Sequence, residues 1–499
     1  MRKSINKIVI VGGGTAGWMT AASLSKHFRQ TQVELVLVES TDIGTVGVGE
    51  ATIPTLRRFY AELGMTDHEV LTKTQATCKL GIQFEGWHRA GSRFIHPFGG
   101  FGQRANDIDF HHYWMKAREQ GDAGDLVDYS LGIKLAEQHK FIEPSPNPPS
   151  ELSIFDWALH FDATLFAGLM REYAQTHGVE RIDARIDKVC LATLDGAIES
   201  LLLADGTQLA ADLFIDCSGF KALLIEQALT TGFENWSEWL PCDSAVAVQS
   251  ERVGDAPPYT VSLAHKAGWQ WRIPLQHRQG NGYVYCSRYC SQDEADRTLK
   301  QHIDGELLHE PRHFTFSTGR RKKAWHKNCI AVGLASGFLE PLESTSIALV
   351  ETAIEKIRRA FAHPSYSQSE VDTFNDLTAQ EYERVRDFII LHYKLNQRVG
   401  DPLWDACRAM AIPEPLQKKI AAFVKSGELL RYPIEIFGRP SWLAIFNGFH
   451  LLPECYHQGV NQLDEQYLLA SLTQMRQSIN QAVESVQSHQ AFLDSLGRG

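Results

Sequence analysis

A glycine-rich turn between a strand and a helix constrains the fold of this chain more than any other segment. The apolar run Lys7–Val11 predicts a strand, Gly12-x-Gly14-x-x-Gly17 follows it, and residues 15–28 have helical character. In such a turn the first glycine permits the tight bend, the second lets a pyrophosphate approach the backbone, and the third lets the helix pack against the strand. We therefore predict a dinucleotide site at the start of this helix, where free amide groups favour phosphate.

The segment after this helix completes a βαβ unit. Residues 33–38 predict a second, largely apolar strand, and Glu39 stands at its end, 22 residues beyond Gly17. A carboxylate at that position can accept hydrogen bonds from ribose hydroxyls. Strands joined by a crossover helix are typical of a parallel sheet, so the sequence predicts an α/β fold.

Two later segments favour FAD over NAD as the dinucleotide. Leu213–Gly219 reads as an apolar strand that ends in a turn of small residues, and Cys329–Gly333 reads as another. Flavoproteins of the glutathione-reductase type return to the cofactor with two such strands, and the chain resembles them here. Two ordinary buried strands are the alternative interpretation.

The spacing of apolar residues separates the rest of the chain into a region of strands and a mostly helical region. Helical character at 345–361, 371–394 and 464–488 predicts a mostly helical last third, and we expect one further helix over 157–177. We expect an FAD-binding module over 1–349, with an interleaved substrate-side sheet, and a helical C-terminal subdomain over 350–499. Strands at 198–203 and 213–216 are predicted around a hairpin turn at Asp205-Gly206. Further strands at 245–251, 259–263, 269–274 and 282–287 are predicted to form the substrate-side sheet.

Composition excludes several other classes of protein. A net charge of −11 argues against binding to nucleic acid, which requires a basic surface. No apolar run reaches the roughly 20 residues of a membrane span. The nine cysteines form no CxxC pair, so we expect reduced thiols, no metal site and a cytoplasmic location.

A second group of motifs points to a family. They are Gly12–Gly17, Gly47–Pro54 (GVGEATIP), Cys78-Lys79-Leu80-Gly81-Ile82, Trp269-Gln270-Trp271-Arg272-Ile273-Pro274 and Glu340–Ile347 (EPLESTSI). With them the chain resembles the flavin-dependent halogenases of the tryptophan halogenase family. The glycine turn is shared by many families, whereas the Trp-x-Trp-x-Ile-Pro motif beside Pro-Leu-Glu-Ser-Thr is specific.

The resemblance implies a defined chemistry. Reduced FAD (FADH2), oxygen and chloride or bromide give hypohalous acid, which passes through a tunnel to an electron-rich arene. No second nucleotide fingerprint is present, so a separate flavin reductase is expected to supply the reduced cofactor. A homodimer is left open.

The resemblance also implies roles for single residues. Lys79 and Glu343 match the family's catalytic pair: the lysine holds or relays the hypohalous acid, and the glutamate polarises it or takes a proton from the arene. Thr345 and Ser346 open a helix whose amides can hold halide. An exposed lysine, an acid that complements a helix dipole and a plain Ser/Thr cap are the ordinary alternatives.

Aromatic residues are assigned to the substrate side of the same site. Trp269 and Trp271 lie two apart on a predicted strand and therefore face one side, where their bulk would keep the substrate from the flavin. Two core aromatics are the alternative. Further pocket candidates are His96, Phe98 and Trp442, and the expected cofactor contacts are Gly12, Gly14, Thr15, Ala16, Gly17, Glu39, Gly49, Val189, Leu334 and Ile347.

Two departures from the family pattern affect specificity. Ser346 stands where many chlorinating members carry glycine, which leaves chloride against bromide open. The region around Pro440–Asn447 lacks the tyrosine pair with which free-tryptophan enzymes hold the amino-acid backbone. We therefore expect indole or an indole derivative as the substrate. A single-component flavin monooxygenase or dehydrogenase, or a non-catalytic flavin-binding protein, are the remaining alternatives.

Overall fold

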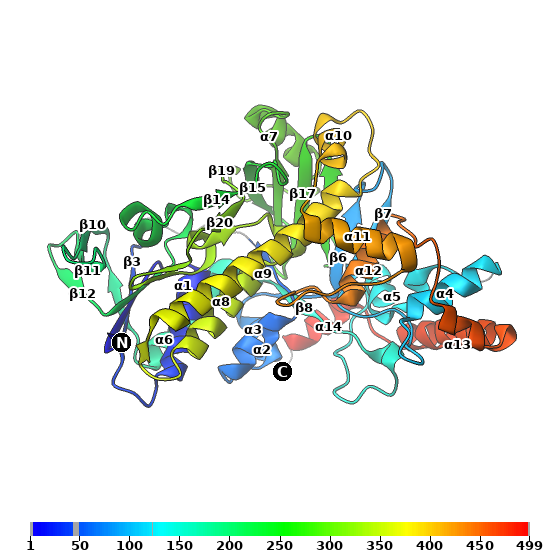
Figure 1. Cartoon of the computed structure of the whole chain (residues 1–499), viewed down its shortest axis with the longest axis horizontal. Helices are drawn as coiled ribbons and strands as arrows, with labels where there is room; N and C mark the ends of the chain where they lie inside the picture. Colours follow the sequence, from blue (N-terminus) through cyan, green and yellow to red (C-terminus); the bar gives the residue numbers. More distant parts are fainter. Residues whose placement is uncertain (1–2, 43–48, 122, 498–499) are drawn as a thin grey trace. The chain divides into compact units, whose positions relative to one another are not determined.

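A computed structural model describes residues 3–42, 49–121 and 123–497 (Figure 1). Gly47 and Val48 of the GVGEATIP motif lie outside the described residues. The chain forms two compact units, each built from three segments. The first unit contains residues 1–76, 161–244 and 314–383, and the second contains 77–160, 245–313 and 384–499.

A six-stranded sheet in the order β21-β22-β13-β2-β3-β9 forms the centre of the first unit. β2 (Lys7–Val11) pairs in parallel with β3 (Glu34–Glu39) on one side and with β13 (Leu213–Asp216) on the other. β22 (Cys329–Ala331) pairs in parallel with β13, so both late strands join the sheet that the glycine turn begins. The α/β prediction of a glutathione-reductase-type module is confirmed in this unit.

Local sequence explains why these strands lie at the centre. Ile8, Val9 and Ile10 of β2 are fully buried, as are Phe214 and Ile215 of β13. Parallel strands are covered on both faces and therefore require continuous apolar runs. The crossover helix α1 (Thr15–His27) follows β2 directly, as the periodicity of residues 15–28 predicts.

Two long helices of the last third begin where the sequence predicts helices. α8 (Ser346–Ala360) and α9 (Gln368–Lys394) lie side by side in Figure 1, and an ion pair of 2.6 Å joins Lys356 to Glu381. The Thr352 hydroxyl donates to the same carboxylate at 2.8 Å. α9 begins in the first unit and ends in the second.

The remaining elements of the first unit are short. The strands β10 (Ile186–Leu191), β11 (Ile198–Leu203) and β12 (Gln208–Ala210) form a separate antiparallel sheet with the predicted Asp205-Gly206 turn. The others are β1 (Lys3–Ser4), β4 (Gly49–Ala51), α2 (Thr55–Glu62), α3 (Asp67–Lys73), α6 (Ala163–Thr176), β9 (Glu180–Asp183), η3 (Gly219–Lys221), η4 (Leu223–Ala228), β14 (Phe233–Asn235), β20 (Gly319–Arg321), β21 (Trp325–His326), η5 (Gly333–Ala335), β23 (Gly337–Phe338), η6 (Pro341–Glu343) and β24 (Ser365–Tyr366).

A seven-stranded sheet in the order β19-β15-β18-β17-β16-β6-β7 forms the second unit's framework. β17 (Gly268–Pro274) carries the Trp-x-Trp-x-Ile-Pro motif and pairs antiparallel with β16 (Thr260–His265) and β18 (Gln279–Tyr285). β6 (Gly81–Glu85) pairs in parallel with β16 and antiparallel with β7 (Arg93–Pro97). The predicted added sheet is therefore present.

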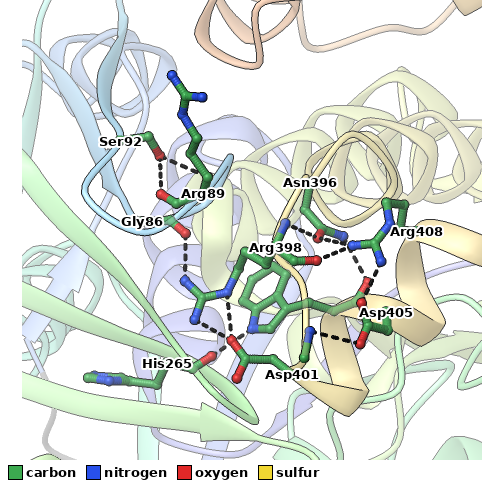
Figure 2. Close-up of polar contacts among 11 residues, drawn as sticks. Gly86, Arg89, Ser92, His265, Asn396, Arg398, Asp401, Asp405 and Arg408 are labelled. Atoms are coloured by element: carbon green, nitrogen blue, oxygen red, sulfur yellow. Dashed lines mark hydrogen bonds and ion pairs between the residues drawn. The ribbon is translucent and has the colours of Figure 1, made fainter.

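An arginine network fixes the turns at one end of this sheet (Figure 2). Arg398 donates to the Gly86 carbonyl at 2.7 Å and pairs with Asp401 at 2.6 Å. The Trp404 indole N–H donates to the His265 carbonyl at 2.6 Å. The segment that follows α9 thus holds the β6–β7 and β16–β17 turns of the sheet.

The helix expected over 157–177 is partly wrong. Its first residues form β8 (Ala158–Asp162), all five of them buried, and the helix α6 starts only at Ala163. The Asp162 carboxylate caps α6 by accepting from the amides of Thr164 and Leu165. Strand pairing of β8 with β5 (Thr77–Lys79) overrides the helical periodicity there, which is a tertiary effect.

Helices and short strands complete the second unit. Among the described residues, no helix is long and apolar enough to cross a membrane. The other elements are α4 (Phe110–Glu119), η1 (Leu126–Tyr129), α5 (Leu131–Glu137), η2 (Glu151–Ser153), β15 (Ser244–Ser250), α7 (Gln292–Gln301), β19 (Arg312–Thr315), α10 (Pro402–Ala409), α11 (Glu414–Ser426), α12 (Arg439–Gly448), η7 (Gln458–Gln462), α13 (Glu465–Glu484) and α14 (His489–Leu496).

Candidate active site

The backbone around the glycine turn is packed so closely that Gly12 and Gly17 leave no room for a side chain. Gly12 has φ +117°, and a Cβ there would lie 2.3 Å from the Cys217 carbonyl oxygen. A Cβ at Gly17 would lie 1.8 Å from the Gly12 carbonyl oxygen, so only glycine lets α1 pack this tightly. A Cβ at Gly14 would meet nothing within 4 Å. The space beside Gly14, at the start of α1, is where a pyrophosphate fits.

Glu39 ends β3 directly beside this turn. A Cβ at Gly13 would lie 1.4 Å from the Glu39 carboxylate, so the middle glycine makes room for that group. Arg181 of β9 donates to the carboxylate at 2.6 Å and also pairs with Asp183 at 3.0 Å. The sequence did not single out Arg181, because β3 and β9 become neighbours only in the folded sheet.

The end of β13 packs against the glycine turn and holds the start of η4. Asp216 is fully buried and accepts hydrogen bonds from the amides of Ser218, Leu224 and Ile225 at 2.8–3.0 Å. Its carboxylate therefore satisfies the orphan amides at the start of η4. The next residue, Cys217, packs against Gly12 and fixes the bottom of the turn.

The other expected cofactor contacts lie around α1, β10 and α8. Gly333 has φ +66°, and a Cβ there would come 2.9 Å from the Ala16 Cβ, which places η5 against the start of α1. Leu334 of η5 is 37% exposed, whereas Ile347 in the first turn of α8 is buried. Gly49 lies on β4, Thr15 is the first residue of α1, and Val189 of β10 packs against the apolar core. The open start of α1 at Gly14 and the carboxylate of Glu39 beside the turn fit a dinucleotide such as FAD.

The start of α8 combines a helix N-terminus with a buried hydroxyl. Ser344 has a left-handed backbone (φ 58°), Thr345 is the N-cap residue, and Ser346 is the first helical residue. Thr345 is 1% exposed and makes no side-chain cap, and its hydroxyl has no hydrogen-bond partner among the described residues. A plain Ser/Thr cap does not describe this geometry, because capping requires the side chain to accept an amide.

Both members of the expected catalytic pair are buried. Glu343 ends η6 in the first unit and is 1% exposed. Lys79 ends β5 in the second unit and is 0% exposed, which is rare for a lysine. The Lys79 ammonium lies 5.1 Å from the centroid of the Phe98 ring, within the range of a cation–π contact. Each of the two residues is therefore enclosed within its own unit.

Hydrogen bonds hold the strand that carries Lys79. The Thr77 hydroxyl donates to the Pro274 carbonyl at 2.7 Å, and the Leu80 amide donates to the Pro258 carbonyl at 2.7 Å. The Phe98 amide donates in turn to the Leu80 carbonyl at 2.9 Å. β5 is thus joined to the end of the Trp-x-Trp strand and to the segment of Phe98.

The two tryptophans of β17 lie on one face, as their spacing predicts. Trp269 is 1% exposed, and its ring centroid lies 6.1 Å from that of Trp271. A Cβ at Gly282 would lie 2.0 Å from the Trp271 ring, so this glycine on β18 makes room for the indole. Trp87 contacts Trp269 at 6.2 Å between ring centroids. Sequence reasoning missed Trp87.

His96 and Trp442 belong to one aromatic cluster in the second unit. His96 is 2% exposed and lies 5.7 Å from the Phe388 ring, and Trp442 lies 5.0 Å from the same ring. Phe437 stacks on Phe388 at 3.9 Å. Phe388 and Phe437 were missed because each is an ordinary apolar residue in its own segment, and only the folded chain groups them.

A buried ion pair lies beside Trp442. The Lys419 ammonium is 4.2 Å from the Trp442 ring centroid and pairs with Glu435 at 2.8 Å. Both side chains are at most 4% exposed. The pKa of Lys419 is lowered because burial disfavours its charged form, and the hydrogen bond to Glu435 opposes this effect only in part. Lys419 also donates to the Leu430 carbonyl, and Arg431 lies 3.8 Å from the Glu435 carboxylate.

Comparisons with known proteins identify the family. The family model for tryptophan halogenase matches residues 7–465 of this chain. The chain belongs to the tryptophan halogenase family. The tryptophan 6-halogenase SttH of Streptomyces toxytricini is 37% identical over 479 residues, which cover 91% of this chain and 88% of SttH.

Solved structures of flavin-dependent halogenases agree with this assignment. BrvH, a flavin-dependent halogenase from Brevundimonas sp. BAL3, is 54% identical with a TM-score of 0.95, and 99% of each chain is covered. Xcc4156, a flavin-dependent halogenase from Xanthomonas campestris, is 40% identical with a TM-score of 0.95 and the same coverage. This member of the family is therefore an FAD-dependent halogenase that acts on an aromatic substrate with halide and receives reduced flavin from a separate reductase.

Proposed function

We propose that this halogenase transfers bromine or chlorine to indole or an indole derivative, with Lys79 as the residue that delivers hypohalous acid. The observation that carries the proposal is the complete burial of Lys79 with its ammonium group 5.1 Å from the Phe98 ring. An amine in such surroundings can hydrogen-bond hypohalous acid or form a haloamine. Phe98 and the adjacent aromatic residues supply the face against which an arene packs.

The cofactor and halide ends of the site are assigned in the same way. Reduced FAD supplies the two electrons that let oxygen convert halide to hypohalous acid. Gly12, Gly14 and Gly17 would hold its pyrophosphate and Glu39 its ribose. The amides at the start of α8 and the Thr345 hydroxyl would hold the halide, because both are hydrogen-bond donors in a buried position.

Glu343 and the two tryptophans complete the proposed roles. The Glu343 carboxylate accepts the proton that the arene loses when the carbon–halogen bond forms. Trp269 and Trp271 fill the face of β17 and keep the arene away from the flavin, so halogenation replaces direct hydroxylation. His96 and Trp442 orient the arene through their shared contacts with Phe388.

The charged residues near Trp442 favour a substrate that is an indole without an amino-acid backbone. Recognition of free tryptophan needs groups that pair with its ammonium and its carboxylate. The ammonium group of buried Lys419 lies 4.2 Å from the Trp442 ring centroid and pairs with the buried carboxylate of Glu435 at 2.8 Å. A substrate backbone that used either of these two charges would have to break the pair.

The test is turnover with mixed halides. The protein is incubated with FAD, a flavin reductase, NADH, equimolar chloride and bromide, and a panel of indole, substituted indoles and free tryptophan. Mass spectrometry is expected to detect halo-indoles with wild type and none with Lys79→Met. Lys116→Met is the matched control, because Lys116 is also buried in the second unit but donates to the Val460 and Leu463 carbonyls.

Three outcomes would contradict the proposal. Halogenation that survives Lys79→Met would exclude the lysine as the delivering group. Faster turnover of free tryptophan than of any indole would exclude the substrate assignment. Oxygenated products that form without halide would exclude halogenation itself.

A further inference from the structure

Two buried histidines contact the residues that precede Lys79 on β5. The Cys78 amide donates to Nε2 of His489 at 3.1 Å, and the Thr77 hydroxyl contacts Nδ1 of His160 at 2.9 Å. Both histidines are 0% exposed. His489 is the first residue of α14, so the contact joins the C-terminal helix to a strand 411 residues earlier in the chain.

The hydrogen bonds determine the protonation state of His489. A backbone amide can only donate, so Nε2 of His489 must carry a lone pair to accept from Cys78. Nδ1 then carries the proton and donates to the Ala256 carbonyl at 2.7 Å. Burial lowers the pKa of His489 to about 4, and neighbouring His139 and Arg252 act in the same direction. His489 is therefore a neutral imidazole with a single tautomer.

His160 is fixed by a similar chain of donors. The Thr77 hydroxyl gives its proton to the Pro274 carbonyl, so it can only accept from Nδ1 of His160. Nε2 of His160 then accepts from the Thr260 hydroxyl at 2.9 Å. Burial, and next the charge of Lys79, hold the pKa of His160 well below its ordinary value. This second imidazole is also neutral and has a single tautomer.

Fixing the backbone before Lys79 has a consequence for its side chain. The ammonium group stands on a flexible four-carbon stem, and its position depends on where the strand holds its Cα. Cys78 is held by His489, Thr77 by His160 and Pro274, and Leu80 by Pro258. The anchors therefore lie on both sides of Lys79, and a shift of the strand would move the amine directly.

We infer that His489 and His160 are positioning residues that fix β5, and thereby aim the amine of Lys79, through their hydrogen bonds to Cys78 and Thr77. The role assigned to Lys79 is the one proposed above, and the inference rests on it. His489 is the more informative of the two, because its two hydrogen bonds can be removed separately. Misplacement of a reacting group by about 1 Å can lower a rate by about a hundredfold.

The test uses two amide side chains in place of His489. The amide of His489→Gln can reach the Nε2 position and accept from Cys78, whereas that of His489→Asn reaches the Nδ1 position and serves Ala256 only. We expect His489→Gln to keep kcat within about threefold of wild type and His489→Asn to lose about tenfold or more, at the same KM for indole. Hydrogen exchange of the peptide that contains Cys78 should accelerate in His489→Asn and stay slow in His489→Gln.

A matched pair of variants controls for the loss of a buried histidine. His111 is buried in the same unit and donates to the Gly427 carbonyl at 2.8 Å, away from β5. His111→Gln and His111→Asn should leave both kcat and the exchange of the Cys78 peptide as in wild type. Thermal melting of all four variants checks that each one is folded.

The exchange measurement separates failure of this inference from failure of the proposed function. Equal exchange at Cys78 in His489→Asn, His489→Gln and wild type would overturn the positioning role, whatever the enzyme's activity. If wild type halogenates without need of Lys79, the exchange result still decides whether His489 holds β5. Equal loss of kcat in His489→Gln and His489→Asn would also overturn it, because a general packing defect would then explain both.

Discussion

The Thr77 hydroxyl donates a 2.7 Å hydrogen bond to the carbonyl of Pro274. Thr77 begins the strand that ends in Lys79, and Pro274 ends the strand that carries the two tryptophans. These residues lie 197 positions apart in the chain. A direct contact thus joins the strand that ends in Lys79 to the strand that carries the two tryptophans.

Replacing Thr77 by valine should destabilise the protein and slow turnover. Valine has nearly the shape of threonine but leaves the Pro274 carbonyl and Nδ1 of His160 without their partner. A buried polar group without a partner costs about 1–3 kcal/mol, so urea denaturation should show a loss of this size or more. Thr77→Ser keeps the hydroxyl and should remain within about 1 kcal/mol of wild type. Equal losses in the two variants would show that the hydroxyl is unimportant.

Replacing Thr345 by valine should weaken halide use selectively. The buried hydroxyl has no partner among the described residues, so its loss removes a donor from the halide without breaking an internal bond. A hydrogen bond to a charged group contributes about 1.5–3 kcal/mol, which corresponds to at least about a tenfold rise in the KM for bromide. Steady-state turnover against bromide concentration measures it, with Thr345→Ser as the control. A change in FAD affinity instead would place Thr345 at the cofactor.

Replacing Glu39 by glutamine should weaken FAD binding. The charged carboxylate beside Gly13 is a stronger acceptor for ribose hydroxyls than an amide, and the substitution also frees Arg181 from its ion pair. We expect the Kd for FAD, from quenching of flavin fluorescence, to rise about tenfold. Glu34→Gln is the matched control, because Glu34 starts the same strand and its partner is Lys7. An unchanged Kd in Glu39→Gln would remove the ribose assignment.

The free energy of unfolding should fall as the pH drops below 6.5. Burial lowers the pKa of His112 to about 3 and that of His489 to about 4, from an ordinary 6.5. Below pH 6.5 the unfolded chain therefore binds protons that the folded chain does not, and above pH 6.5 these two groups contribute no slope. Each histidine can contribute up to about 1.4 kcal/mol per pH unit. Urea denaturation between pH 7.5 and 5 measures the slope, and His112→Phe should make it shallower. An unchanged slope in that variant would contradict the assignment.

Much of the fold could be read from periodicity and turn residues. The strands β6, β7, β9, β19 and β21 of the two large sheets were not predicted. The βαβ unit, the strands β13, β22 and β15 to β18, and the helices α8, α9 and α13 coincide with predicted segments within a few residues. These elements have strong local signals, namely continuous apolar runs or clear helical spacing. The helix predicted over 157–177 is wrong in its first residues because these form β8. That strand is stabilised by its pairing with β5, which lies about 80 residues earlier and so leaves no signal in the local sequence.

The candidate site likewise contains some residues that the sequence predicts and others that only the folded structure reveals. Lys79, Phe98, Trp269 and Trp271 were found from motifs, and the structure adds that the lysine is buried against the Phe98 ring. Arg181, Phe388 and Phe437 carry no motif, and His489 lies at the far end of the chain. Each of them acquires its place only when distant strands and helices pack together.

The sequence by itself determined the family, the dinucleotide turn and the residue types of the proposed catalytic pair, because glycine spacing and motif chemistry are local properties. Tertiary structure decided which of these residues are buried and what holds them. Burial turns Lys79 from an ordinary solvated amine into a group enclosed beside Phe98. The anchors of its strand, His489 and Pro274, lie hundreds of residues from it in sequence, and only long-range packing brings their hydrogen-bonding groups within reach of β5.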